Sequence, residues 1–500
     1  MKKMLPSLLP ALTALLLVLS YPKFDMGWLA WLALAPLSYY LLKSRSLKAA
    51  ALGGAGAGFL FYLGLLYWIY PTLRAGGVGA FVSALGLVLL ALLMSLEFLA
   101  VSAYGFYLKR AGPGVWPYAF ALGWAALEYV KVLLSRKLVW FPWFMLGYTQ
   151  WDYKPMIQIA SVTGVYGLSA AVCFTGALAG SLFARDLKPA ARLLRLLPAA
   201  AVAAGLFLFG WAELRKADSL RPVRELKVAL LQPSIDQYAK WDEAQAGKIL
   251  ALMALQAAQA GGADLAVWPE NALPCWINDS ACRGWLRRAA SSSGVGGSFV
   301  GSVSRGEGKH VSAFLLDGSG AIIASYDKRQ LVPFGEYVPL RGLLGKFIKP
   351  VGELGEFEPG APNQPLMTFR GYKIGATLCY ESIFPYLFAG DTRAGAELFV
   401  NITNDGWYLD TAAPYQHFIA SVFRAVENRR TVVRAANNGI SGVIDPWGRV
   451  TAVTALDECT VLRASAPVYA VRALFPFYGR WLAAGVLLAV SAFLVAMLLI

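Results

Sequence analysis

Charged residues and histidine are unusually scarce in this chain. Charged residues make up 15% of its 500 residues, against about 25% in an average soluble protein, and only His310 and His417 are histidine. A metal centre with two or three histidine ligands is therefore nearly excluded, and we expect neither a metal nor a cofactor. Any Cys–His or Ser–His chemistry must use one of these two residues, both of which we expect to be structural or surface residues.

Cysteine is scarce as well. The chain has five, an odd number, and no CxxC motif, so neither a disulfide framework nor a zinc site is expected. Cys275 and Cys282 can pair if their part of the chain faces an oxidising compartment, but the spacing alone leaves the paired and the free state open.

Hydrophobic residues, in contrast, make up 57% of the chain, against about 45–50% in an average soluble protein. They gather in runs, and a helix needs about 20 apolar residues to cross a bilayer. The runs that approach this length are 4–20, 26–42, 49–70, 78–106, 114–134, 156–183, 194–212 and 480–500. We therefore predict a membrane bundle of about seven helices over 1–212, a different domain over 213–479, and a closing transmembrane helix over 480–500.

The net charge is +15, and many of the basic residues flank the apolar runs. Because this arrangement fits a membrane surface and no nucleic-acid motif is present, we expect no nucleic-acid partner. The positive-inside rule favours a cytoplasmic N-terminus, which places residues 213–479 outside. The first run is interpreted as an uncleaved anchor rather than a signal peptide.

Residues 213–479 show the pattern of an α/β domain. Short β-branched runs recur, with amphipathic helical stretches at 241–260 and 414–428 between them. The predicted strands are 226–233, 263–270, 297–304, 312–317, 321–328, 373–380, 396–403, 431–439 and 460–468. Several are buried-type runs rather than clean alternations of apolar and polar residues, which predicts sheets covered on a face and layers of helix and sheet.

Three of these strands carry a reactive residue at their end, namely Glu270, Lys328 and Cys379. A cysteine nucleophile needs a base for its proton, and a cation or N–H donors for the oxyanion that forms on attack. Glu270 is the candidate base and Lys328 the candidate cation. If Cys379 lies on a strand-to-helix elbow, the backbone N–H of Tyr380 is a second oxyanion donor.

Each of these residues also has a simpler explanation when it is taken alone. A cysteine at a strand end is usually a small buried hydrophobe. A lysine after an aspartate usually lies in a solvated turn, and Trp-Pro-Glu usually ends a strand with an exposed acid. The catalytic interpretation is supported by their joint appearance, in the order Glu, Lys, Cys, at three strand ends.

That order is the pattern of the nitrilase superfamily, and the local sequences extend the likeness. The segments VWPENALP, YDKRQLVPFGEYVPL, IGATLCYESIFP and NITNDGWY resemble the apolipoprotein N-acyltransferases of the bacterial cell envelope. The resemblance covers the whole chain and implies an αββα sandwich in addition to the membrane helices. It implies that Glu270 is the general base, Lys328 the oxyanion-stabilising cation, and Cys379 the nucleophile that forms an acyl thioester.

The resemblance also implies roles for residues around this triad of Glu270, Lys328 and Cys379. Glu336 matches a second acid that positions Lys328 or the reacting group. Supporting or substrate-binding roles are implied for further residues: Tyr380 and Glu381 beside the nucleophile, and Trp241 as an aromatic near the lipid entrance.

Other polar residues of this domain have two explanations each. Asn404, Asp405 and Trp407 follow a strand and are candidates to line the pocket, although Asn-Asp-Gly is also a plain turn sequence. The arginines within 429–434 either hold phosphate or pair with acids.

Two segments elsewhere are equally open. Glu97 lies inside the fourth apolar run, where a carboxylate is either functional or part of a helix–helix contact. Residues 341–352, RGLLGKFIKPVG, form either a lid that dips into the membrane interface or an ordinary packed loop.

The reaction implied by the resemblance is a two-step acyl exchange. A phospholipid, typically phosphatidylethanolamine, acylates Cys379, and the N-terminal diacylglyceryl-cysteine of an apolipoprotein then takes the acyl chain on its amine. The expected protein is a monomeric, multi-pass protein of the bacterial cytoplasmic membrane, with its catalytic domain on the periplasmic side.

Two other functions were considered, and each explains the predicted spans and the triad less completely. A membrane-anchored nitrilase-type amidohydrolase for a small C–N substrate would use the same triad, but about eight spans exceed what an anchor requires. A transporter predicts repeat symmetry and broken spans, which we do not find, and it leaves the triad unexplained.

Overall fold

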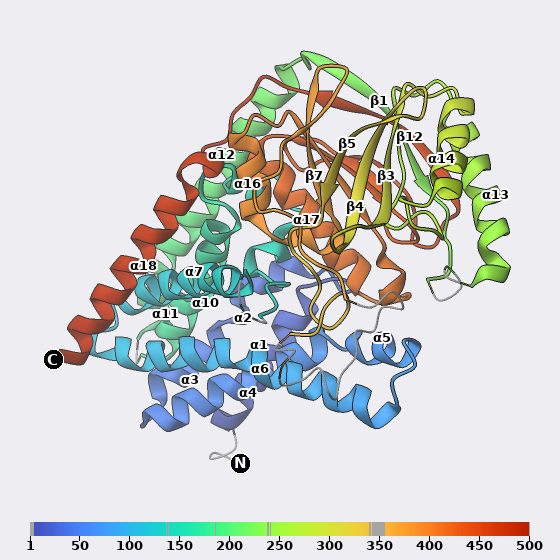
Figure 1. Cartoon of the computed structure of the whole chain (residues 1–500). Helices are drawn as coiled ribbons and strands as arrows, with labels where there is room; N and C mark the ends of the chain where they lie inside the picture. Colours follow the sequence, from blue (N-terminus) through green and yellow to red (C-terminus); the bar gives the residue numbers. More distant parts are fainter. Residues whose placement is uncertain are drawn as a thin grey trace. The chain divides into compact units, whose positions relative to one another are not determined.

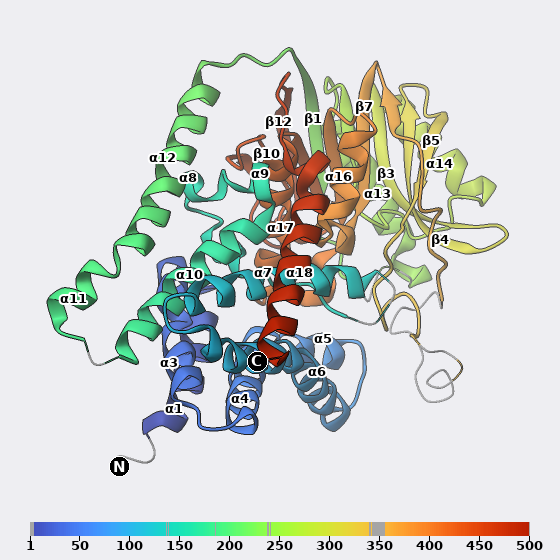
Figure 2. The ribbon, with the colours of Figure 1, turned by 90° about the vertical axis from the view of Figure 1, so that its left-hand side faces the viewer.

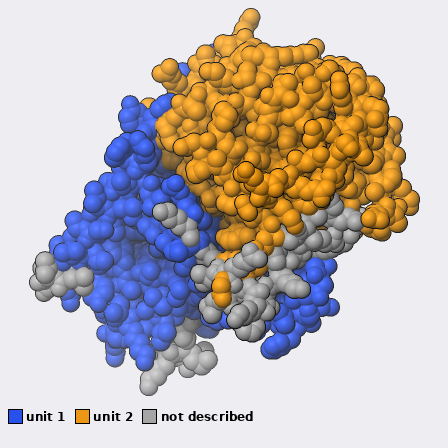
Figure 3. All heavy atoms as spheres, viewed as in Figure 1, with its two compact units in different colours: residues 1–219, 477–500 blue, residues 220–476 orange. Residues whose placement is uncertain are grey.

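The computed structural model of the chain describes residues 5–136, 138, 140–185, 187–237, 240, 242–339, 342 and 356–499. The chain divides into two compact units, residues 1–219 with 477–500 and residues 220–476 (Figure 3). The first unit is helical, and the second contains two sheets and the helices around them.

The helical unit is built from apolar helices of very different lengths (Figure 1). Its α-helices are α1 (Leu5–Leu19), α2 (Ala30–Ala33), α3 (Ala35–Lys43), α4 (Leu47–Leu65), α5 (Ile69–Ala75), α6 (Ala80–Tyr107), α7 (Trp116–Ser135), α8 (Lys154–Ile157), α9 (Ala160–Thr163), α10 (Val165–Phe183), α11 (Pro189–Leu194), α12 (Leu197–Ser219) and α18 (Phe475–Leu499). Its 3-10 helices are η1 (Gly27–Leu29), η2 (Leu108–Ala111) and η3 (Leu146–Gln150).

Among the described residues, 5 helical segments are long and apolar enough to cross a membrane. They are Leu47–Leu65, Ala80–Ala111, Val165–Phe183, Pro189–Ser219 and Phe475–Met497. The membrane-type helical bundle predicted from the apolar runs is therefore present, but the predicted count of about eight spans is not confirmed.

The difference in count has physical causes in particular helices. Residues 26–42 were predicted as one span and instead form η1, α2 and α3, because Pro36 has no N–H to continue a helix and starts a new one at its first turn. The apolar part of α1, Leu8–Leu19, is shorter than a bilayer requires. α7 carries Glu128 and Lys131 in its second half.

Glu97 of α6 is a packed contact that ties three helices and a loop together. Its Oε2 accepts hydrogen bonds from the Tyr62 hydroxyl of α4 at 2.6 Å and from Nζ of Lys131 of α7 at 3.2 Å. Its Oε1 accepts a bond from Nε1 of Trp140 at 2.8 Å. Lys131 also donates to the Phe144 carbonyl at 2.5 Å. Of the two explanations given for Glu97, these bonds support the helix–helix contact.

Replacing Glu97 with Ala should destabilise the helical unit. The ammonium of Lys131 would stay buried without its carboxylate, and breaking a buried pair in this way costs about 3–5 kcal/mol. We expect a clear fall in the thermal unfolding midpoint of the detergent-solubilised protein. The double variant Glu97→Leu with Lys131→Met removes both charges and should recover most of the loss. An unchanged midpoint in Glu97→Ala would contradict this role.

The second unit contains two six-stranded sheets. The first has the order β12-β1-β2-β3-β4-β5, with β1 (Arg224–Gln232), β2 (Leu265–Val267), β3 (Gly297–Arg305), β4 (Lys309–Asp317), β5 (Ile322–Asp327) and β12 (Thr460–Val468). The second has the order β11-β10-β9-β8-β7-β6, with β6 (Met367–Phe369), β7 (Tyr372–Leu378), β8 (Leu398–Thr403), β9 (Thr431–Ala436), β10 (Gly442–Ile444) and β11 (Val450–Val453). In each sheet the three strands β1–β3 or β7–β9 pair in parallel, and the outer strands pair antiparallel.

The two sheets share one apolar core, and helices cover their outer faces (Figure 1; Figure 2). Val228 and Phe299 of the first sheet belong to the same buried cluster as Ile374 and Val400 of the second. The covering helices are α13 (Glu243–Gln259) and α14 (Ser280–Ser292) on the first sheet, and α16 (Pro385–Arg393) and α17 (Ala413–Asn428) on the second. Because the central strands are buried on both faces, most of their residues are apolar and no regular alternation of apolar and polar residues is seen. The predicted αββα sandwich is confirmed.

Candidate active site

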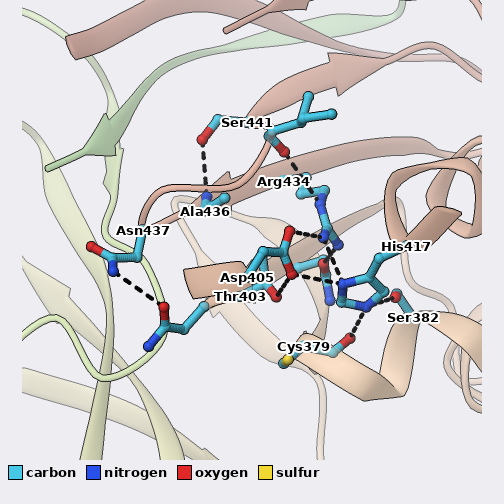
Figure 4. Close-up of polar contacts among 12 residues, drawn as sticks. Cys379, Ser382, Thr403, Asp405, His417, Arg434, Ala436, Asn437 and Ser441 are labelled. Atoms are coloured by element: carbon cyan, nitrogen blue, oxygen red, sulfur yellow. Dashed lines mark hydrogen bonds and ion pairs between the residues drawn. The ribbon is translucent and has the colours of Figure 1, made fainter. Parts of the chain in front are cut away.

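Cys379 lies on a sharp turn between a strand and a helix. β7 ends at Leu378, and the 3-10 helix η4 (Cys379–Ile383) begins directly after it. At Cys379 φ is 47°, a left-handed conformation that L side chains rarely adopt. Nε2 of His417 donates to the Cys379 carbonyl oxygen at 3.0 Å and helps to hold this conformation (Figure 4). The strand-to-helix elbow expected from the sequence is therefore present.

The ammonium group of Lys328 lies between two carboxylates. Lys328 follows β5, Glu270 follows β2, and Glu336 lies in the loop after β5. Nζ of Lys328 donates to Glu270 Oε1 at 3.0 Å and to Glu336 Oε1 at 2.6 Å. The second carboxylate oxygens accept backbone N–H groups, Glu270 Oε2 from Asn404 at 3.1 Å and Glu336 Oε2 from Val332 at 2.8 Å. Both carboxylates are thus fixed in orientation by the protein.

These charges act on one another and on the thiol of Cys379. Burial lowers the pKa of Lys328, but Glu270 and Glu336 outweigh it and hold that pKa well above its ordinary value. Burial raises the pKa of the Cys379 thiol, Glu270 adds to the rise, and Lys328 opposes it. Cys379 is therefore a neutral thiol at rest, while Lys328 is a fixed cation. A base must take the thiol proton as the sulfur attacks, and the carboxylate of Glu270 fits that role.

Glu381 ties the end of β5 to the elbow that carries Cys379. It is completely buried, and its carboxylate accepts several hydrogen bonds from these two segments. The donors are the Tyr326 hydroxyl (2.8 and 2.9 Å) and the backbone N–H groups of Arg329 (2.7 Å), Gln330 (3.1 Å) and Leu378 (2.8 Å). Because Lys328 lies within the first segment, Glu381 positions both Lys328 and Cys379.

A second buried network supports the elbow through His417. Nδ1 of His417 contacts Asp405 Oδ1 at 2.8 Å, and Arg434 donates to Asp405 Oδ2 at 2.9 Å (Figure 4). Burial raises the pKa of Asp405, but Arg434 and His417 outweigh it and lower that pKa to about 2. Burial and Arg434 lower the pKa of His417. Asp405 and Arg434 therefore form a buried ion pair, and pairing with an acid is one of the two explanations given for Arg434.

The same network contains the one group of possible metal ligands found in the described part of the chain. A ligand atom of each of Cys379, Asp405 and His417 lies within 4.8 Å of the others. However, Nε2 of His417 also lies 2.8 Å from the Ser382 hydroxyl, and both Asp405 oxygens are engaged by His417 and Arg434. The bonds within the protein already use these atoms, so the geometry favours a structural network over a metal site.

The remaining predicted site residues differ in their placement. The ring of Tyr380 is buried and packs edge to face on Phe384 with centroids 5.1 Å apart. Asn404 is buried beside Glu270, and Trp407 is half-buried in the 3-10 helix η5 (Asp405–Tyr408).

Three expectations concern segments around the site. Trp241 lies outside the described residues, as does the segment 341–352 apart from Gly342. Cys275 and Cys282 form a disulfide, which selects one of the two states left open by their spacing.

In the segment after β1 the sequence singled out Trp241 alone, and two further residues of this segment were missed. Gln237 is buried and hydrogen-bonded to the side chain of Asn404, 167 residues further along the chain, and Lys240 is completely buried. Neither residue lies in a motif that separates it from an ordinary loop residue. Only the contact between distant segments reveals their position.

Comparisons with known proteins were made for the whole chain. A family model described as "Apolipoprotein N-acyltransferase N-terminal domain" matches residues 13–178, and one described as "Carbon-nitrogen hydrolase" matches residues 227–473. A curated apolipoprotein N-acyltransferase of Geobacter metallireducens is 39% identical over 91% of this chain and 88% of its own length. One of Azotobacter vinelandii is 34% identical over 89% of this chain and 86% of its own length.

Solved structures of an amidase match about half of the chain. A variant of the amidase from Nesterenkonia sp. AN1 is 24% identical, with a TM-score of 0.40, and the match covers 52% of this chain and 99% of that one.

Replacing Glu381 with Gln should disturb the position of Lys328 relative to Cys379. The amide nitrogen of Gln cannot accept the N–H groups that face it, and each hydrogen bond to a charged group contributes about 1.5–3 kcal/mol. We expect a lower free energy of unfolding and a burst of p-nitrophenolate from p-nitrophenyl butyrate that is slower by about tenfold, because the oxyanion loses its aligned cation.

Glu397→Gln is the matched control, since Glu397 also accepts a backbone N–H and pairs with an arginine but lies near the surface. It should change stability by at most about 1 kcal/mol and leave the burst rate unchanged. Equal burst rates in Glu381→Gln and wild type would contradict the positioning role.

Proposed function

The chain belongs to the family of apolipoprotein N-acyltransferases, and from this premise we propose that it transfers a fatty acyl chain from a membrane phospholipid to the N-terminal amine of diacylated apolipoproteins. The chain is thus an acyltransferase with a carbon-nitrogen hydrolase domain. The observation that carries the proposed mechanism is the Lys328 ammonium held between Glu270 and Glu336, with Cys379 on an elbow within reach of its charge.

In the first step Cys379 takes the acyl chain. Glu270 accepts the thiol proton while the sulfur attacks the ester carbonyl carbon of the phospholipid. The proposed stabilisers of the oxyanion are the Lys328 ammonium and the backbone N–H of Tyr380, the residue that follows the nucleophile on the elbow. Glu270 then returns the proton to the departing glycerol oxygen, so that a thioester and a lysophospholipid result.

In the second step the amine of a diacylglyceryl-cysteine attacks the thioester carbonyl carbon. Glu270 takes a proton from the nitrogen, the carbon–sulfur bond breaks, and the same proton restores the Cys379 thiol. Lys328 again stabilises the oxyanion, and Glu336 keeps Lys328 in place through both steps. Burial of the triad supports transfer over hydrolysis, because a thioester survives only where water is kept away.

The apolar helices and the family place the protein in the bacterial inner membrane. We infer a multi-pass topology with a cytoplasmic N-terminus and the α/β unit on the periplasmic side, on the distribution of Lys and Arg around the apolar runs. The proposed donor is phosphatidylethanolamine, and the proposed working state is a monomer.

A transfer assay tests the proposed function. The detergent-solubilised protein is incubated with phosphatidylethanolamine labelled in its acyl chains and with a synthetic diacylglyceryl-cysteine peptide. Labelled triacyl peptide should form, and Cys379→Ser should form none. Glu336→Gln should lower kcat by about 10²-fold, because Lys328 loses one of its two carboxylates. Glu307→Gln, on the exposed turn between β3 and β4, should match wild type.

The same assay separates transfer from hydrolysis. Label that leaves as free fatty acid at the same rate with and without the peptide would contradict transfer. It would favour an amidohydrolase-like reaction with water, in which the triad is the same but the acceptor is not an amine.

A further inference from the structure

Lys240 stands apart from the other buried cations of the α/β unit. Its side chain is 0% exposed, and Nζ has no hydrogen-bond partner among the residues that the structure describes. By contrast, Lys328 lies between two carboxylates, and the buried Arg424 and Arg434 pair with Glu427 and Asp405. A buried ammonium without a partner is unfavourable, and such groups concentrate where a ligand supplies the partner.

The segment that carries Lys240 is fixed next to Glu270. Asn437 exchanges hydrogen bonds with the backbone of Ile235 at 3.1 and 2.7 Å. Gln237 bonds to the side chain of Asn404, and the backbone N–H of Asn404 donates to Glu270 Oε2. The segment is therefore held on the Oε2 side of Glu270, whereas Lys328 occupies Oε1.

The electrostatics agree with this placement. Burial lowers the pKa of Lys240 to about 8, and the carboxylate of Glu270 acts against that shift. The two carboxylates of the site, Glu270 and Glu336, share one cation in Lys328. Lys240 is thus a second cation near Glu270, and its Nζ has no hydrogen-bond partner among the described residues.

We propose that Lys240 binds the phosphate of the phospholipid donor while Cys379 is acylated. The inference rests on the proposed function and names the part of the donor that a further residue recognises. Glu270 must lie beside the glycerol oxygen to which it returns a proton. The phosphate is attached to the same three-carbon glycerol, so it comes close to Glu270 on a side that Lys328, engaged with the oxyanion, does not occupy. A lysine ammonium is a common ligand of phosphate oxygens at such a position.

This role separates the two steps of the reaction. The acceptor, a diacylglyceryl-cysteine, has a thioether in place of the phosphate ester. Lys240 therefore contributes to acylation by phospholipid and makes no specific contact in the transfer to the amine.

Acylation by two donors tests the proposal in the full-length protein. One donor is phosphatidylethanolamine, and the other is p-nitrophenyl palmitate, which has no phosphate. Formation of acyl-Cys379 is followed by intact mass. Lys240→Met should slow acylation by phosphatidylethanolamine about tenfold or more, the effect of losing one charge-assisted hydrogen bond, and should leave acylation by p-nitrophenyl palmitate within about twofold of wild type. Lys240→Arg should retain most of the phospholipid rate, since it keeps the positive charge.

Two controls make the result interpretable. Lys248→Met removes a lysine from the exposed face of α13 and should match wild type with both donors. The melting temperature of Lys240→Met should equal or exceed that of wild type, because the change removes a buried charge that no described residue pairs with.

Three outcomes would overturn the proposal. Equal slowing with both donors would mean that Lys240 acts on the triad and not on phosphate. Unchanged rates with both donors would mean that it has no part in acylation. Failure of wild type with phospholipid, together with normal acylation by p-nitrophenyl palmitate, would refute the proposed donor itself.

Discussion

The proposed chemistry of the α/β unit depends on one buried ammonium group, that of Lys328. A cation removed from water is tolerated only where opposite charge and hydrogen bonds replace its hydration. Glu270 and Glu336 supply both, at 3.0 and 2.6 Å. Since these residues come from separate loops, the need to pair them fixes the loops after β2 and β5 together. The cysteine elbow after β7 is then placed where the same cation opposes the rise in pKa of its thiol.

Buried side chains around the triad stabilise a backbone conformation at Cys379 that is unfavourable by itself. Cys379 has a left-handed φ, and such a conformation persists only where neighbouring groups over-determine it. Glu381 holds the elbow from the side of β5, and His417 holds the Cys379 carbonyl from the side of α17. Because these supports are charged or polar and completely buried, they specify position more than they add stability. Lys240 breaks the pattern, as a buried charge that the described residues leave without a hydrogen-bond partner.

Much of the α/β unit could be predicted from the sequence, because its signals are local. The runs 226–233, 297–304 and 460–468 are strands β1, β3 and β12. The short strands β6, β10 and β11 were missed, since three or four residues carry little periodicity.

In the helical unit, composition indicated apolar helices but not their breaks, and the run 26–42 divides at Pro36. The proposed triad was predicted as a set at strand ends, and the structure brings Lys328 and Glu270 of that set together. The resemblance named Glu381 but not its partners, and Gln237 and Lys240 were missed, because the contacts that reveal them join segments far apart in the sequence.

Intact-protein mass spectrometry tests the central claim most directly, that the charges around Lys328 serve a nucleophile at Cys379. Wild type and Cys379→Ala, both purified in detergent, are incubated with phosphatidylethanolamine and then treated with hydroxylamine. The account predicts a mass gain of one fatty acyl chain in wild type that hydroxylamine removes, and no gain in the variant. A folded wild-type protein that gains no mass in the presence of lipid, or an equal gain in Cys379→Ala, would contradict it.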